Sequence, residues 1–225
     1  MLFLGFGSGL PYILLISTST AWLRDVNVDL SYIGFFTWIT FTYTFKFAWA
    51  PLVDRFSVPF LAQYGHRKSW IAFMQILIFL SLLFISNIDP IENFILFCAV
   101  GATIAFAGSI QDIAIDAFRI EYAHISDQGN LAASYQLGYR LAIIAATSIA
   151  LIFADINGWS MTFKLMAGLM CLGLLGVIFS KEEKNKELGK LNFINSIVEP
   201  LKDFFSRFGM FMASILLLII ATYRL

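Results

Sequence analysis

Two carboxylates and a guanidinium lie within a long apolar segment, where they could bind a polar solute or carry a proton. Asp112 and Asp116 are four residues apart and Arg119 follows three residues later, so all three lie on one face of a helix. Further back, the same face carries only small residues: Gly101, Ala105 and Gly108. A charged side chain that faces lipid costs about 2.5–3.5 kcal/mol on insertion scales, so we expect this face to contact protein or a water-filled path.

An alternative is that these charges simply mark a helix end that emerges into water. That interpretation accounts for Glu121 and in part for Arg119. It does not account for Asp112, which lies about ten residues, or ~15 Å, before the interface expected near Tyr122. We therefore favour a functional role for Asp112 and Asp116.

The composition is that of a membrane protein. Of the 225 residues, 59% are hydrophobic and 13% are charged, against about 25% charged in soluble domains, and the mean hydropathy is +0.79. Long uncharged runs predict an all-α integral membrane protein surrounded by the lipid bilayer, rather than a barrel. The net charge of zero gives no indication of a nucleic-acid partner.

The apolar runs predict six transmembrane helices and the beginning of a seventh. The six are expected at residues 1–23, 30–51, 69–87, 92–122, 131–154 and 159–180. Residues 1–180 are interpreted as a six-helix N-terminal bundle, and residues 181–207 as a cytoplasmic linker with an amphipathic helix on the membrane surface. Residues 208–225 are interpreted as the start of a truncated seventh helix. This is the organisation of one half of a two-bundle transporter.

Charged side chains recur at similar depths within these helices. Arg140 in the fifth helix is predicted to lie ~15 Å from the cytoplasmic side, level with Asp112, and the two are expected to pair because each lowers the insertion cost of the other. Lys46 is expected near the level of Asp116. If Arg140 keeps Asp112 ionised, Asp116 is the carboxylate that is free to carry a proton. The alternative is a static pair of Asp116 with Arg119.

Lys and Arg residues are concentrated in the loops after the second, fourth and sixth helices, so these loops and the N-terminus are expected in the cytoplasm. His66 and His124 fall in such loops and are interpreted as solvated residues rather than proton relays. Cys98 and Cys171 lie in apolar runs and are interpreted as packing residues. The sequence contains no catalytic set and no metal-ligand spacing, so we expect no enzyme, no cofactor and no metal site.

Several segments resemble those of one transporter family. The loop after the second helix resembles the cytoplasmic signature loop of the major facilitator superfamily, through Asp54, Arg55, Gly65, Arg67 and Lys68. It departs from that pattern at Pro51, near where a glycine is usual, and in its extra residues. Together with residues 7–11, 21–23, 46–54, 111–119 and 137–141, the loop makes the chain similar to AmpG-type muropeptide permeases over nearly its whole length.

The resemblance implies proton-coupled import of anhydro-muropeptides, which are products of cell-wall turnover, across the bacterial inner membrane. It also implies a C-terminal bundle that this chain lacks. Five residues match family positions in the transport path: Gln111, Asp112, Asp116, Arg119 and Arg140. Tyr43, Gln136, Ser109 and Lys46 are further candidates, because a muropeptide offers hydroxyls, amides and carboxylates to such groups. Two alternatives remain open: a carrier for another anionic solute such as acetyl-coenzyme A, and a truncated gene product that transports nothing.

Overall fold

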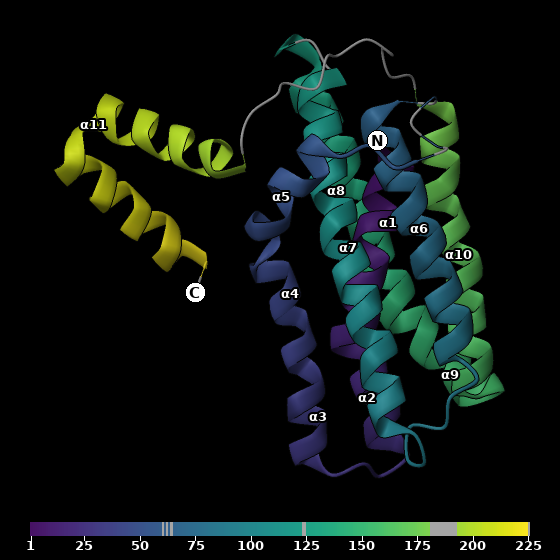
Figure 1. Ribbon diagram of the computed structural model, residues 1–225. Coiled ribbons are helices and arrows are strands. Elements are labelled where there is room, and N and C mark those ends of the chain that lie inside the picture. Colours follow the sequence, from purple (N-terminus) through teal and green to yellow (C-terminus); the bar gives the residue numbers. More distant parts are fainter. Residues whose placement is uncertain (60, 62, 64, 123–124, 181–192, 225) are drawn as a thin grey trace. The chain divides into compact units, whose positions relative to one another are not determined.

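The structure is a computed structural model that describes residues 1–225 except 60, 62, 64, 123–124, 181–192 and 225. The chain divides into two compact units, Met1–Lys186 and Glu187–Leu225. Regular secondary structure is entirely helical in the described residues, with no strand (Figure 1). The prediction of an all-α membrane protein is confirmed.

The described residues of the first unit form six long helical segments, of which three are built from shorter pieces. In chain order they are α1 (Leu2–Ile13), η1 (Leu14–Thr18) and α2 (Ser19–Asp25); α3 (Leu30–Thr37), η2 (Trp38–Thr40), α4 (Phe41–Thr44) and α5 (Lys46–Arg55); α6 (His66–Ile85); α7 (Phe94–Tyr122); α8 (Gln128–Ile144), η5 (Ala145–Ile149) and α9 (Ala150–Asn157), preceded by the turn η4 (Ile125–Asp127); and α10 (Trp159–Phe179). Among the described residues, five of the six are continuous, long and apolar enough to cross a membrane. The chain is a multi-pass membrane protein.

The second segment is interrupted because its sequence competes with helical hydrogen bonding. Thr37, Thr40 and Thr42 each donate their hydroxyl to a carbonyl three residues earlier, at 2.6–2.7 Å, and η2 is a 3₁₀ turn. Pro51 lies inside α5 and has no N–H to donate, and the helix is broken at Phe45 between α4 and α5. The same segment continues to the end of α5, four residues beyond the predicted helix end.

α1 packs between α8 and α10, and glycines allow its neighbours to approach closely. An added Cβ at Gly5 would fall on the backbone carbonyl of Tyr135 in α8, and one at Gly138 would fall on the carbonyl of Leu2. After Pro11 the chain makes a π-helical turn, η1, before it continues as α2. Small residues followed by a proline therefore serve close helix packing in a membrane, where contact between backbones replaces the hydrophobic effect.

An aromatic cluster lies at the end of the bundle where α2 and α3 meet. The Trp22 ring of α2 lies 5.3 Å from Phe97 of α7 and 5.0 Å from Phe163 of α10, measured between centroids. Phe36 of α3 adds a further contact to Phe97, at 5.4 Å. All four side chains are buried, so the cluster joins four helices around one apolar centre.

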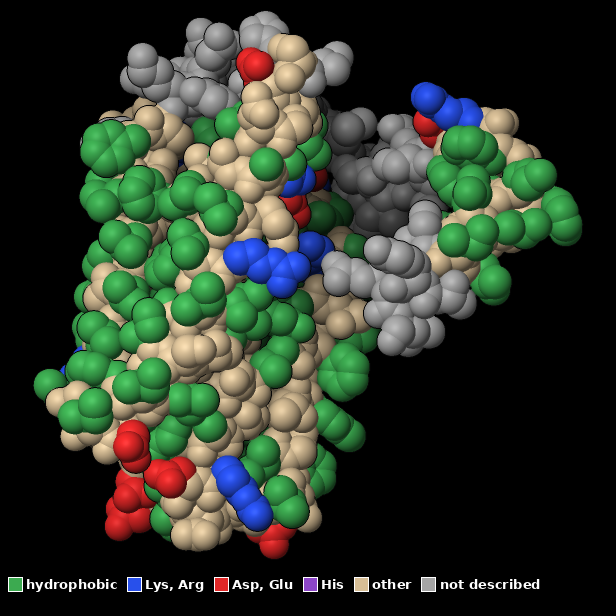
Figure 2. All heavy atoms as spheres, turned by 180° about the vertical axis from the view of Figure 1, so that it is seen from behind, with side chains coloured by type: hydrophobic (Ala, Val, Ile, Leu, Met, Phe, Trp, Pro, Cys, Tyr) green, Lys and Arg blue, Asp and Glu red, His purple; other side chains and the backbone are tan. Residues whose placement is uncertain are grey.

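Hydrophobic side chains cover most of the face shown in Figure 2 between the two ends of the bundle, and acidic side chains gather near one end. The exposed apolar residues of the long helices include Leu80, Phe84, Ile95, Ile152 and Ile178. An apolar outer surface of this kind is what a bundle immersed in lipid requires.

The described part of the second unit is α11 (Phe193–Arg224), which bends at Gly209, where φ is +71°. Glycine adopts this left-handed conformation without strain. Near the bend, the Phe204 ring lies 5.1 Å from the Phe208 ring, and Arg207 pairs with Asp203 at 2.8 Å. Residues 181–192 of the predicted linker lie outside the described residues, and the surface helix and the seventh span remain predictions.

Candidate functional site

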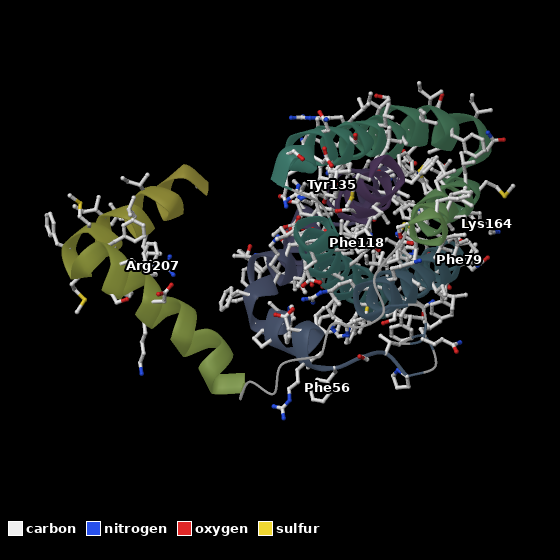
Figure 3. All side chains as sticks on the ribbon, turned by 90° about the horizontal axis from the view of Figure 1, so that it is seen from above. Phe56, Phe79, Phe118, Tyr135, Lys164 and Arg207 are labelled. Carbon is white, nitrogen blue, oxygen red and sulfur yellow. The ribbon has the colours of Figure 1, made fainter. Side chains whose placement is uncertain are left out.

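Asp112 of α7 is connected to two neighbouring helices. Its Oδ1 accepts a hydrogen bond from the Ser8 hydroxyl of α1 at 2.5 Å, and the Ser8 oxygen lies 2.7 Å from the Tyr135 hydroxyl of α8. Ser8 is buried and Asp112 is partly buried. Asp112 forms no ion pair within the described residues. Figure 3 shows Tyr135 on the side of α8 that faces α1 and α7, whereas Lys164 lies at the outside of α10.

Asp116, one turn further along α7, lies between two cations. Its Oδ2 is 3.9 Å from Lys46 Nζ of α5, and its Oδ1 is 3.5 Å from Arg119 Nη2. The Arg119 Cζ is also 5.6 Å from the centre of the Tyr135 ring, within cation–π range. The side chains of Lys46 and Asp116 are 38% and 43% exposed, so this group of charges is accessible from the bundle surface.

Tyr43 of α4 lies over the same face of α7. Its hydroxyl is buried without a hydrogen-bond partner in the described part of the chain, and it stands against Gly108, where any added Cβ would collide with it. The Tyr43 ring packs edge-on against Tyr12 of α1, with centroids 4.8 Å apart. The rings of Tyr135 and Tyr139 lie 6.4 Å apart on α8. Four tyrosines from three helical segments thus accompany the charged residues.

Two predicted path residues lie away from this cluster. Arg140 and Gln136 are exposed on α8, and Arg140 forms no ion pair within the described residues. The expected pairing of Arg140 with Asp112 is therefore wrong. Equal depth does not make two side chains face each other. Tyr135 and Arg140 are five residues apart, about 140° around the helix, so when Tyr135 faces Asp112, Arg140 faces elsewhere.

Gln111 and Ser109 are buried inside the bundle. The Ser109 hydroxyl donates to the Phe106 carbonyl of its own helix, at 2.8 Å. The Gln111 amide nitrogen lies 3.7 Å from the position that a Cβ would take at Gly7 of α1. The Asp112–Asp116 cluster, formed by these two carboxylates with Ser8, Tyr135, Lys46 and Arg119, therefore does not include the side chains of Gln111 and Ser109.

Sequence reasoning missed three polar residues: Ser8, Tyr135 and Gln75. Ser8 and Tyr135 complete the hydrogen-bonded connection to Asp112. Gln75 lies in the middle of α6 and is fully buried. A single amide within an otherwise apolar run was the signal for Gln75, and the i, i+4 spacing of Tyr135 and Tyr139 was the signal for the tyrosines.

The residues of the signature loop form a second polar cluster, at the end of the bundle. Arg67 at the start of α6 donates through Nη1 to Asp54 Oδ1 at 2.6 Å and through Nη2 to Glu121 Oε1 at 3.1 Å. Asp54 belongs to the end of α5 and Glu121 to the end of α7. The Arg67 side chain is only 10% exposed, so a nearly buried guanidinium connects the ends of three helices.

The other loop residues have separate environments. Gly65 has φ of +121°, a backbone conformation that other residues rarely adopt. Lys68 Nζ donates to the Ser180 carbonyl beyond α10 at 2.8 Å. Arg55 is exposed, and its Cζ lies 5.7 Å from the centre of the Phe56 ring.

The sequence suggested that His66 is a freely solvated residue, but its side chain has defined partners in the structure. It is the first residue of α6, its Nδ1 lies 3.0 Å from Ser57 Oγ, and its Nε2 lies 2.9 Å from the Val53 carbonyl of α5. The helix start brings the ring over the open carbonyl end of α5. His124 lies outside the described residues.

Groups of three or more His, Cys, Asp or Glu side chains suited to a metal ion are absent from the part of the chain that the structure describes. Cys98 and Cys171 are free thiols. Cys98 is partly buried, as expected for a packing residue, but Cys171 is exposed on α10.

A bundle of membrane-spanning helices with a cluster of charges and tyrosines on α1, α4, α5, α7 and α8 has the architecture of a solute carrier. The chain belongs to the major facilitator superfamily, whose family model matches residues 1–224.

Several curated proteins are similar to this chain. The anhydromuropeptide permease of Escherichia coli (strain K12) is 34% identical over 226 residues, which cover 100% of this chain and 45% of that protein. The putative transporter AmpG 4 of Rickettsia conorii is 33% identical over 211 residues, covering 91% of this chain and 51% of the relative. The putative transporter AmpG 3 of Rickettsia typhi is 29% identical over 201 residues, covering 88% and 47%. The chain spans about half the length of these relatives.

Proposed function

We propose that the chain is the N-terminal half of a proton-coupled importer that carries anhydro-muropeptides across the bacterial inner membrane. The observation that carries the proposal is the 34% identity, along the whole chain, to the anhydromuropeptide permease of Escherichia coli. A second bundle would complete the path, because alternating access requires two bundles that rock about a central site.

The chemistry of the Asp112–Asp116 cluster supports a solute of this kind. Arg119 and Lys46 hold Asp116 at 3.5 and 3.9 Å, longer than the about 2.7–2.9 Å of a strong charge-assisted hydrogen bond. A carboxylate on the solute can compete for both cations. The partly exposed ring of Tyr43 offers the amphipathic surface that a sugar requires.

The contacts favour Asp112 over Asp116 as the proton carrier. Asp116 already lies between Arg119 and Lys46, with which it forms ion pairs at 3.5 and 3.9 Å. Asp112 has a single hydroxyl donor, Ser8, and no ion pair within the described residues. Its charge is the least compensated in the cluster, so its protonation is the one that a change of access would alter most.

Transport assays on the complete permease in right-side-out vesicles test both parts of the proposal. Wild-type vesicles should accumulate labelled anhydro-muropeptide when the outside is acidified. Asp112→Asn should lose this accumulation while retaining exchange of internal for external solute. Asp116→Asn, the matched control, should weaken solute affinity and keep accumulation. Undiminished accumulation by Asp112→Asn would overturn the proposal that Asp112 carries the proton. Failure of the wild type to move the solute would overturn the proposal that anhydro-muropeptides are the substrate.

The excess of Lys and Arg in alternate loops supports an N-terminus in the cytoplasm. Ser126 in the turn η4 and Asn157 at the end of α9 are exposed at opposite ends of the bundle and are suitable reporters. In a variant whose Cys98 and Cys171 are replaced, an impermeant maleimide added to intact cells should label a cysteine at position 157 and not one at 126. The reverse pattern would contradict this orientation.

A further inference from the structure

Two glutamines at the meeting point of four helices bury their amide groups without a protein partner. Gln75 of α6 and Gln111 of α7 are both 0% exposed. None of their four amide nitrogen and oxygen atoms has a hydrogen-bond partner within the described residues. Buried side-chain amides in proteins are hydrogen-bonded in the large majority of cases, because an unpaired one loses its hydration without compensation.

Glycines on the other two helices allow the backbones of α1 and α10 to pack closely against these amides. A Cβ at Gly7 of α1 would lie 2.9 Å from Gln75 Nε2 and 3.7 Å from Gln111 Nε2. A Cβ at Gly173 of α10 would lie 2.6 Å from Gln75 Nε2. Both amides therefore lie beside Gly7, and that of Gln75 also lies beside Gly173, where α1 and α10 carry no side chain.

We infer that Gln75 and Gln111 bind ordered water at this junction of α1, α6, α7 and α10. An amide offers both donors and acceptors, and water is the small ligand that complements both. Neither glutamine amide is hydrogen-bonded to a charged group in the described structure, so the chemistry suits a neutral ligand rather than an ion. Two amides supply the several polar partners that a buried water requires.

The hydration site is distinct from the cluster around Asp112 but lies directly beside it along α1 and α7. Gly7 directly precedes Ser8, and Gln111 directly precedes Asp112. The Ser8 hydroxyl is already engaged by Asp112 and Tyr135, so it belongs to the other cluster. Water shared by the two glutamines would tie α7 to α6 one residue before the Ser8–Asp112 hydrogen bond.

Solid-state NMR of the chain in lipid bilayers, with ¹⁵N in the glutamine side chains, tests the site directly. Few signals are expected, because the chain contains only these glutamines: Gln63, Gln75, Gln111, Gln128 and Gln136. The signals of Gln75 and Gln111, identified by their loss in Gln75→Met and Gln111→Met, should receive magnetisation from water. Absence of this transfer, or a direct contact between the two side-chain amides without water, would overturn the inference.

Thermal unfolding of the same variants gives an independent test through the sign of the effect. If water satisfies both amides, Gln75→Met and Gln111→Met each leave the other amide poorly paired and should lower Tm by about 3–6 °C. The double variant should lose less than the sum of the two, because no amide is left unpaired. Gln136→Met, at an exposed position, is the matched control and should change Tm by about 1 °C or less. A rise of Tm in the single variants would show that the amides are dry.

Discussion

Arg67→Met should destabilise the bundle more than any other single charge removal in the signature loop. The substitution keeps the unbranched aliphatic stem but removes the guanidinium that connects Asp54 and Glu121. Because these carboxylates end α5 and α7, their connection to the start of α6 is lost at once. Arg67→Lys keeps the charge, but a lysine presents no planar fork and should recover only part of the loss.

The magnitude follows from the exposure of each partner. A hydrogen bond to a charged group contributes about 1.5–3 kcal/mol when it is protected from water. The Asp54 side chain is 56% exposed, so its contact with Arg67 is closer to the ~1 kcal/mol or less of a surface pair. The Glu121 side chain is 32% exposed and keeps more of the protected value. The total is about 2–3 kcal/mol, which lowers Tm by roughly 5–10 °C in a chain of this size.

Thermal unfolding in mild detergent, followed by far-UV circular dichroism, measures this shift. Arg55→Met is the matched control, because Arg55 is exposed and contacts only the Phe56 ring among the described partners. It should move Tm by about 1–2 °C at most. Equal stability of the Arg67→Met and Arg55→Met proteins would refute the argument that the Arg67 contacts stabilise the helix ends.

Three further outcomes are expected. Gly138→Ala places a methyl group on the Leu2 carbonyl and should lower the free energy of unfolding by about 1–3 kcal/mol or more. Gly168→Ala has open space around its Cβ and should raise the free energy of unfolding by about 0.5–1 kcal/mol. Chemical denaturation compares the two variants. Thr18→Val removes the hydroxyl that donates to the Ala146 carbonyl between the π-helical turns and should cost about 1–2 kcal/mol in the same assay, while Thr20→Val, which loses only bonds within its own helix, should cost less. The Ser31 backbone N–H donates to Asp29 at 2.8 Å and lowers the pKa of that carboxyl below its ordinary value. The hydrogen bond therefore stabilises α3 above the pKa that Asp29 has in the unfolded chain, and this stabilisation is lost as the pH falls through the pKa of the folded state. NMR titration of Asp29 detects the change, and Asp29→Asn abolishes it.

The sequence alone determined the helical architecture, because the thickness of a bilayer fixes how long an apolar run must be. The six helices were predicted within a few residues of where they lie. The spacing of Asp112, Asp116 and Arg119 likewise required a shared face, since a helix turns by a fixed angle per residue. The interrupted second helix was less visible, because its breaks depend on threonine hydroxyls that compete with the backbone only in some conformations.

Only the tertiary structure decided which residues meet. Depth in the membrane can be counted along the chain, but the rotation of each helix about its axis depends on how neighbouring helices pack. Glycine contacts between α1 and α8 turn Tyr135 toward Ser8 and Asp112, although Ser8 and Tyr135 are 127 residues apart. The same rotation leaves Arg140 outside, at the depth that had suggested a partnership with Asp112. Helix length is a local property of the sequence, whereas helix orientation is set by close contacts between segments far apart in the chain.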